Sequence, residues 1–285
     1  MQKIVIFLIL FFTCQFSFSK ELLEIDRLVN GKYNQIKFKN EFENELALYR
    51  ATKKHKHLLN AKYIEAFIFG NNGDENKRIL KLLWVIEHSK DEDYLIYTYA
   101  NYHLSSELSV LGSNTLALKY SNTALKNCIK FNITSLLHFT FSLEGAIYYK
   151  TKNYKSAITS YFKALETEKE KDYLFRASML NNISLCKMNL KELDASNLYI
   201  EKSLSNLSKI KNKTFDDNLF KIIVEGNLGS NYFAQGNHER AKPLLENELN
   251  FYEKNNQNLS SSFNLLNELL KIYIKDGTPP VTGMT

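Results

Sequence analysis

Four copies of one spacing of small residues constrain what this chain can fold into. Each copy has a small residue, a turn signal seven residues later, a second small residue five beyond it and usually another seven later. Two antiparallel helices that touch through their small residues have this spacing. With a period of about 40 residues, it predicts a solenoid, in which no helix pair buries its apolar face without neighbours. The copies are Ser105–Gly112–Ala117–Ala124, Gly145–Lys152–Ala157–Ala164, Ser184–Lys191–Ser196–Ser203 and Gly229–Gly236–Ala241–Glu248.

The composition favours long helices over many short strands. Only three prolines and ten glycines occur among 285 residues, which is sparse punctuation for an all-β chain. The formal net charge is +6, but lysines and glutamates are interspersed along the expected helices instead of forming one basic stripe. We therefore predict an all-α fold, a right-handed α-α superhelix (solenoid) of helix pairs, with no nucleic-acid partner.

The first 19 residues have the organisation of a secretory signal peptide. Lys3 supplies a basic start, residues 4–12 form an unbroken apolar run, and Ser17 and Ser19 place small residues before a cleavage point at Lys20. Residues 1–19 are therefore predicted to be a signal peptide, and the protein is predicted to be exported to the periplasm.

Two other interpretations of this segment stay open. Cys14 could anchor a lipoprotein, although the residues before it fit the usual lipoprotein pattern poorly, or the apolar run could remain as an uncleaved anchor. No second apolar run of about 20 residues follows, so the mature chain is predicted to have no membrane span.

Helical periodicity divides the rest of the chain into three parts. Residues 94–277 hold the four helix pairs and a final helix without a partner, which is expected to cap the solenoid. Residues 20–93 are expected to form degenerate helical pairs, and residues 278–285 a disordered tail. The helices expected upstream are Leu22–Leu28, Phe42–Tyr49, Tyr63–Phe69 and Ile79–Ile86.

Polar residues mark two helix starts inside the repeat region. Asn153 suits an N-cap because its side chain can accept from a free backbone N–H, and Thr214 with Asp217 three residues on is close to a capping box. The third copy has lost both turn signals, since Lys191-Glu192 replaces them.

Two copies carry further residues at fixed spacing, Leu228–Gly229–Tyr232–Gly236–Ala241–Leu245 and Gly145–Tyr148–Ala157–Tyr161–Ala164. These copies resemble tetratricopeptide repeats (TPR). The resemblance covers residues 94–277, with a period longer than the usual length of about 34 residues. Together with a signal peptide, the long period is similar to the periplasmic TPR regions of bacterial sensor and regulator proteins.

The resemblance implies that the first helix of each pair lines a concave groove. Groove positions of the family lie three residues before the first small residue of a copy and one, four and five residues after it. They predict an aromatic and amide surface that could hold a peptide, unless several of these residues pack against the neighbouring pair. The predicted partner-binding residues are Tyr102, Ser106, Ser142, Tyr149, Asn181, Asn189, Ser230 and Phe233. The predicted repeat-packing residues are Ser105, Gly145, Ser184, Gly229, Ala117, Ala157, Ser196 and Ala241.

The sequence contains no motif of a recognised catalytic, nucleotide-binding or metal site. His238–Glu239 has no second ligand one helical turn away, so a solvated helix face is the favoured interpretation. We predict a chain that is not an enzyme and that holds no cofactor and no metal. The leading hypothesis is a periplasmic module that binds a protein or peptide in the TPR groove. The alternative is a sensor or regulatory domain that acts through a membrane partner.

Overall fold

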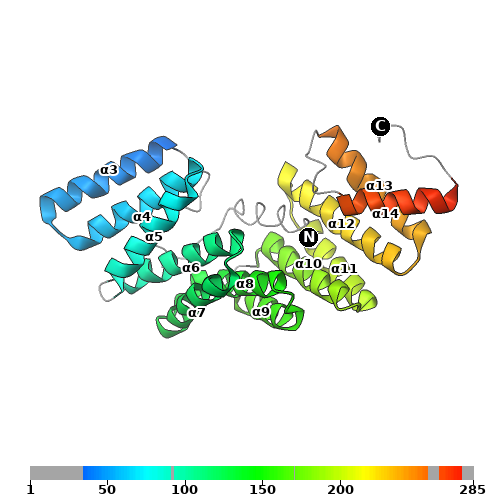
Figure 1. Ribbon diagram of the computed structural model, residues 1–285, viewed down its shortest axis with the longest axis horizontal. Helices are drawn as coiled ribbons and strands as arrows, with labels where there is room; N and C mark the ends of the chain where they lie inside the picture. Colours follow the sequence, from blue (N-terminus) through cyan, green and yellow to red (C-terminus); the bar gives the residue numbers. More distant parts are fainter. Residues whose placement is uncertain (1–34, 91–92, 170, 256–262, 278–285) are drawn as a thin grey trace. The chain divides into compact units, whose positions relative to one another are not determined.

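The structure is a computed structural model that describes residues 35–90, 93–169, 171–255 and 263–277 (Figure 1). Within these ranges the regular elements are α-helices, and none is a strand. The predicted signal peptide, the helix expected at Leu22–Leu28 and the tail at 278–285 lie outside the described residues. The described chain divides into two compact units, residues 35–169 and 171–277, which we call the N-terminal and C-terminal units.

Each unit is a stack of helices in which every helix packs against the one before it, which confirms the all-α solenoid. In each unit the first helices of successive pairs also touch, α4 with α6 and α6 with α8, and α10 with α12 and α12 with α14. The N-terminal unit comprises α3 (Gln35–Thr52), α4 (His55–Asn71), α5 (Glu75–Ser89), α6 (Tyr94–Val110), α7 (Asn114–Lys130), α8 (Thr134–Lys150) and α9 (Tyr154–Thr167). The C-terminal unit comprises α10 (Tyr173–Asn189), α11 (Leu193–Ser208), α12 (Phe215–Ala234), α13 (His238–Lys254) and α14 (Phe263–Asp276).

The small residues lie where the two helices of a pair meet. Ser105 Oγ donates to the carbonyl oxygen of Ala117 at 2.8 Å, and Ser196 Oγ donates to that of Ser184 at 2.8 Å. All eight predicted repeat-packing residues are buried. The spacing of small residues therefore marks the helix–helix contacts, as the sequence predicts.

Two glycines at these positions make room for a side chain of the second helix. A Cβ atom on Gly145 would lie 2.7 Å from ring atoms of Tyr161, which is closer than carbon atoms approach. On Gly229 it would lie 3.0 Å from Cγ of Leu245. Gly145 thus lets an aromatic ring fill the contact, and Gly229 lets a leucine do so.

The third copy keeps the turn of the others although its sequence signals are gone. Lys191 adopts φ 66°, close to the 79° of Gly112 in the first copy. The N–H of Glu192 then donates to the carbonyl oxygen of Lys187 at 3.0 Å, a bond typical of a helix that ends in a left-handed residue. The backbone bond is kept, and lysine replaces the glycine that would adopt this φ most easily.

A complete pair, α4–α5, precedes the four that the spacing predicts. Its turn has Gly73 at φ 77°, and Ala66 stands at the first small position, but Arg78 occupies the second. The guanidinium of Arg78 lies 5.0 Å from the ring centroid of Phe67 and forms an ion pair with Glu107 of α6 at 3.1 Å. Because a largely buried arginine replaces the small residue, this pair looks degenerate in sequence.

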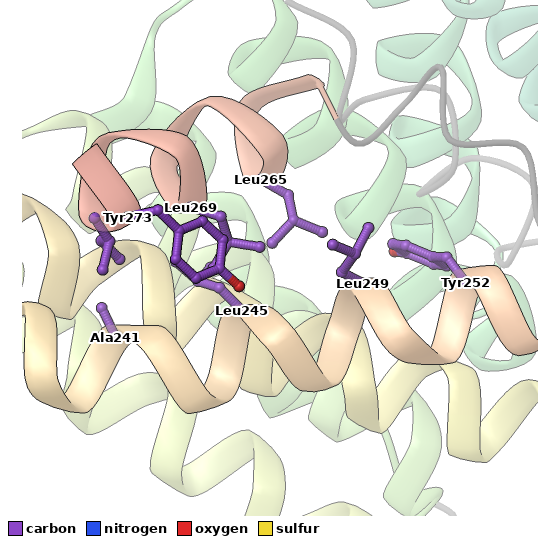
Figure 2. Close-up of a cluster of buried hydrophobic side chains, with 8 residues drawn as sticks. Ala241, Leu245, Leu249, Tyr252, Leu265, Leu269 and Tyr273 are labelled. Atoms are coloured by element: carbon purple, nitrogen blue, oxygen red, sulfur yellow. The ribbon is translucent and has the colours of Figure 1, made fainter. Parts of the chain in front are cut away.

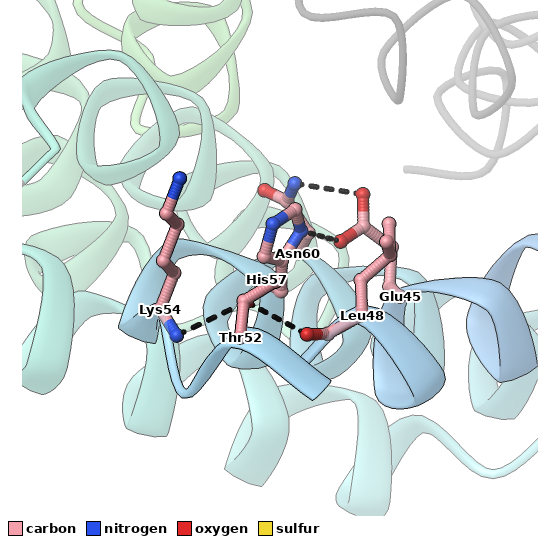
Figure 3. A network of polar contacts seen from close by, with 6 residues as sticks. All are labelled: Glu45, Leu48, Thr52, Lys54, His57 and Asn60. Atoms are coloured by element: carbon pink, nitrogen blue, oxygen red, sulfur yellow. Dashed lines mark hydrogen bonds and ion pairs between the residues drawn. The ribbon is translucent and has the colours of Figure 1, made fainter. Parts of the chain in front are cut away.

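A polar network holds α3 against α4 (Figure 3). Its centre is the carboxylate of Glu45, which accepts from Asn60 Nδ2 at 3.0 Å and lies 2.7 Å from Nδ1 of His57. Thr52 Oγ1 donates to the carbonyl oxygen of Leu48 at 2.7 Å near the end of α3. Glu45 is buried, and its two polar partners offset the cost of removing a carboxylate from water.

The predicted helix starts are confirmed. The side chain of Asn153 accepts from the N–H of Ser156, and Thr214 and Asp217 exchange the two hydrogen bonds of a capping box. These caps begin α9 and α12, the second and first helices of their pairs.

The last helix, α14, covers the apolar face of α13 (Figure 2). The buried cluster comprises Ala241, Leu245, Leu249 and Tyr252 of α13 and Leu265, Leu269, Ile272 and Tyr273 of α14. α14 therefore completes the core of the C-terminal unit. Among the described residues, no helix has the length and apolar character needed to cross a membrane.

Candidate partner-binding surface

The candidate site is the surface of the first helices, considered separately in each unit. These are α6 and α8 in the N-terminal unit and α10 and α12 in the C-terminal unit, and they carry all eight predicted partner-binding residues. Four of these residues are buried, namely Ser106, Ser142, Asn181 and Ser230. The other four are partly or fully exposed, namely Tyr102, Tyr149, Asn189 and Phe233.

The four buried residues do not face a groove as the resemblance implied. Ser142 and Asn181 have no exposed surface, and Oδ1 of Asn181 accepts from Asn227 Nδ2 at 3.1 Å, which joins α10 to α12. Ser230 Oγ donates to Oε2 of Glu268 at 2.7 Å, which joins α12 to α14. Neighbouring first helices approach so closely that short polar side chains at mid-helix positions become internal contacts.

A row of amide side chains fastens α12 to α10 and α11. Asn231 Nδ2 donates to Ser196 Oγ at 2.6 Å, and Gln235 Nε2 donates to Oδ1 of Asp194 at 2.9 Å. Together with Asn227 they follow one another at four-residue spacing, which places them on one face of α12. We call Asn227, Asn231 and Gln235 the amide seam. The seam was not predicted, although its spacing is visible in the sequence.

The residues that stay accessible lie mainly at the C-terminal ends of the first helices. Val110 ends α6 and is 52% exposed, Asn189 ends α10, and Tyr149 and Phe233 stand one residue before the ends of α8 and α12. Both rings are half-buried and contact an aromatic residue that follows in the chain, which holds them in place. We call these residues the C-terminal rim of their units, Val110 and Tyr149 in the N-terminal unit and Asn189 and Phe233 in the C-terminal unit. Tyr102, by contrast, lies near the middle of α6 and packs on the edge of a buried cluster.

A lysine adjoins the rim in the N-terminal unit. Lys150 ends α8, and its Nζ donates to the carbonyl oxygen of Ser109 at 2.7 Å and to the Oγ of Ser109 at 3.1 Å. Burial lowers the pKa of Lys150, because an ammonium group loses hydration there. The lysine links α6 to α8 and adds positive charge beside Tyr149.

Elsewhere in the described chain, burial is the main cause of most pKa shifts, whereas a side-chain hydrogen bond from Lys77 lowers the pKa of Asp74. Burial raises the pKa of Cys128 and of Cys186 to about 12, so both thiols stay protonated and non-nucleophilic at neutral pH. Burial also lowers the pKa of His138 to about 4, against the opposing influence of Glu168. No three His, Cys, Asp or Glu side chains of the described ranges are grouped so as to hold a metal ion.

Comparison with known proteins shows the fold. No model of a protein family matches the chain, and no curated protein matches it. Among solved structures, BtubC (BKLC) from P. vanneervenii is similar, with a TM-score of 0.65, 15% identity, and coverage of 82% of this chain and 93% of that one. The apo form of RapI has a TM-score of 0.63 at 15% identity, covering 90% of this chain and 77% of RapI.

A third similar structure contains nearly identical TPR-like repeats from Podosopora anserina. Its TM-score is 0.56 at 11% identity, and the alignment covers 70% of this chain and 97% of that one. The chain therefore has a TPR-like helical-repeat fold, as the resemblance of its second and fourth copies implied. At such identities the likeness concerns the arrangement of helices alone.

Proposed function

We propose that this protein is a non-enzymatic interaction module that binds a protein or peptide partner along its first helices. The observation that carries the proposal is the accessibility of the C-terminal rim, since the mid-helix polar groups are used in contacts between helices. Half-exposed aromatic rings offer apolar area at small entropic cost, and an exposed amide can bond a peptide backbone. The TPR-like fold supports the same function.

We further propose that the module works outside the cytoplasm, in the periplasm. The basic start, apolar run and small residues of positions 1–19 support export. The alternative of a lipid-anchored form rests on Cys14. The second candidate function is a sensor or regulatory domain that acts through a membrane partner, and it is supported by the long repeat period together with the predicted signal peptide of residues 1–19.

Site-specific photo-crosslinking in the native host tests the proposal. A photoreactive phenylalanine analogue replaces Tyr149 in one variant and Phe233 in another. Matched control variants carry it at Ile129 on α7 and at Leu198 on α11, which are exposed apolar positions on second helices. The crosslinked products are then identified by mass spectrometry.

A discrete partner that is captured from Tyr149 or Phe233, and not from Ile129 or Leu198, is the expected result. If that partner is an integral membrane protein, the result supports the sensor function over the stand-alone module. Equal capture from all four positions, or from none, would contradict a binding surface on the first helices.

A further inference from the structure

The last helix exposes an apolar stripe on the side away from the core. Phe263 is 70% exposed, Leu270 46% and Ile274 72%, and half-buried Leu266 lies between them. Their spacing of three and four residues puts them on one line of α14. A terminal helix that shields a solenoid from water needs a polar outer face, and this helix has an apolar one.

The sequence of α14 repeats the pattern of the first helix before it. Leu269, Leu270, Tyr273 and Gly277 have the same spacing as Leu228, Gly229, Tyr232 and Gly236 in α12. Gly229 is the residue through which α12 meets its second helix, α13, near Leu245. Leu270 therefore stands where a second helix would contact α14, and no described element covers it.

The charged side chains beside the apolar stripe indicate which kind of helix binds to it. Lys271 and Lys275 follow Leu270 and Ile274 by one residue each, so they flank the stripe along one side, and both are exposed. On the other side, α14 meets α13 through Lys242–Asp276 and through Tyr273 with Glu246. An incoming helix thus finds apolar contacts in the middle and unmatched positive charge on its open side.

We propose that the outer face of α14 binds an amphipathic helix whose apolar side is flanked by acidic residues. Leucine in place of glycine at position 270 implies side-chain interdigitation with the occupant, because the backbones cannot approach as they do at Gly229. Acidic side chains of the occupant complement Lys271 and Lys275. In the alignment of α14 with α12, Ile274 stands at the position of Phe233, whereas Phe263, Leu266 and Leu270 have no counterpart in the C-terminal rim.

A peptide with the sequence of residues 20–34 of this chain serves as the probe. It has Leu22, Ile25 and Val29 at helical spacing, with Glu21 and Asp26 on either side of them, and its three acidic and three basic residues give it a formal net charge of zero. A labelled peptide is titrated by fluorescence anisotropy against the full chain carrying Leu22→Ser and Ile25→Ser, which keeps the chain's own segment from competing. A second peptide replaces its three acidic residues by lysine.

The expected results are saturable binding, at least about tenfold weaker affinity for the charge-reversed peptide, and a similar loss with Ile274→Asp. The matched control Leu198→Asp, an exposed leucine on α11, should leave affinity unchanged. Because Ile274 and Leu198 are exposed, both variants should fold, which circular dichroism checks.

Three outcomes would overturn the proposal. They are no binding of the peptide with the native sequence, equal binding of both peptides, or binding that Ile274→Asp does not affect. Self-association that Ile274→Asp abolishes in the absence of peptide would assign this face to a second copy instead.

Discussion

Arg78 of α5 and Glu107 of α6 form a buried ion pair that joins two successive helix pairs, with Nη2 and Oε1 3.1 Å apart and the side chains only 14% and 9% exposed. Gly70 makes space for it, because a Cβ atom there would lie 2.5 Å from Cδ of Arg78. The pair replaces the small-residue contact that the other repeats use.

Breaking this pair should destabilise the N-terminal unit. Removal of one partner leaves the other charge buried, so we expect Arg78→Met to lower the free energy of unfolding by about 3 kcal/mol, measured by urea denaturation. The control is Lys77→Ala, which removes a lysine that is 59% exposed and paired with Asp74, and it should hardly move the midpoint. Equal midpoints for the two variants would show that the buried pair contributes nothing.

Replacing Lys191 by glycine in the turn of the third copy should stabilise the protein. Lys191 holds φ 66°, a conformation that costs a side-chain-bearing residue about 1 kcal/mol, so Lys191→Gly should raise the free energy of unfolding by up to that amount. Glu201→Gly, in the middle of α11, should lower it by about 1 kcal/mol. Thermal and urea unfolding check both, and a destabilised Lys191→Gly variant would refute this account of the turn.

Filling the contact at Gly145 should be costly. The added methyl of Gly145→Ala meets ring atoms of Tyr161 at 2.7 Å, and overpacking of this kind costs about 1–3 kcal/mol. Gly229→Ala meets Leu245 at 3.0 Å and should cost less. If calorimetry ranks the two variants in the opposite order, the ring of Tyr161 moves away more easily than its packing suggests.

The protein should become less stable as the pH is lowered, because His138 is buried in its neutral form. Its folded pKa of about 4 lies below the ordinary value of 6.5, so the unfolded chain binds the proton first as pH drops. The stability contributed by the neutral ring is fully present above pH 6.5 and is lost as pH falls toward 4. We expect a loss of about 2 kcal/mol between pH 8 and pH 5. Replacement by phenylalanine, His138→Phe, should flatten this part of the profile relative to the unmodified protein; parallel profiles would contradict the assignment.

The two buried thiols should report the opening of each unit separately. Cys128 belongs to the N-terminal unit and Cys186 to the C-terminal unit, and both have a pKa raised to about 12 by burial. Iodoacetamide at pH 8 should therefore leave both unmodified in the folded protein and modify each one as its unit unfolds in urea. Peptide mass spectrometry measures the two sites, and rapid alkylation in native buffer would show that the thiols are accessible.

The fold could be predicted from sequence because helix pairs need small residues where their backbones meet. Ser105 with Ala117 and Ser184 with Ser196 mark such contacts, and the structure confirms them. The helices of α4–α5 were expected only as a degenerate pair, and the pair departs from the spacing because Arg78, for which Gly70 leaves space, stands where the other copies have a small residue. At Lys191 the spacing placed the turn, although the usual turn residues are missing there, and its hydrogen bonds come from the backbone alone.

The candidate surface was predicted only in part. Spacing gives the direction in which a side chain leaves its helix, so Tyr149 and Phe233 were placed on an accessible face. It does not give the distance to the neighbouring first helix, and that distance decides whether Asn181 meets a peptide or meets Asn227. Short polar side chains fit both settings, whereas an aromatic ring is too large for the narrow contact.

The amide seam also makes the packing of α12 depend on which repeat precedes it. Asn227 requires an amide at position 181, and Asn231 requires the hydroxyl of Ser196. A repeat copied from the N-terminal unit would place alanine, as at positions 117 and 157, where Ser196 stands and would remove this acceptor from the buried amide of Asn231. Repeats in this part of the molecule are therefore not interchangeable modules, because these contacts need particular side chains at positions 181 and 196.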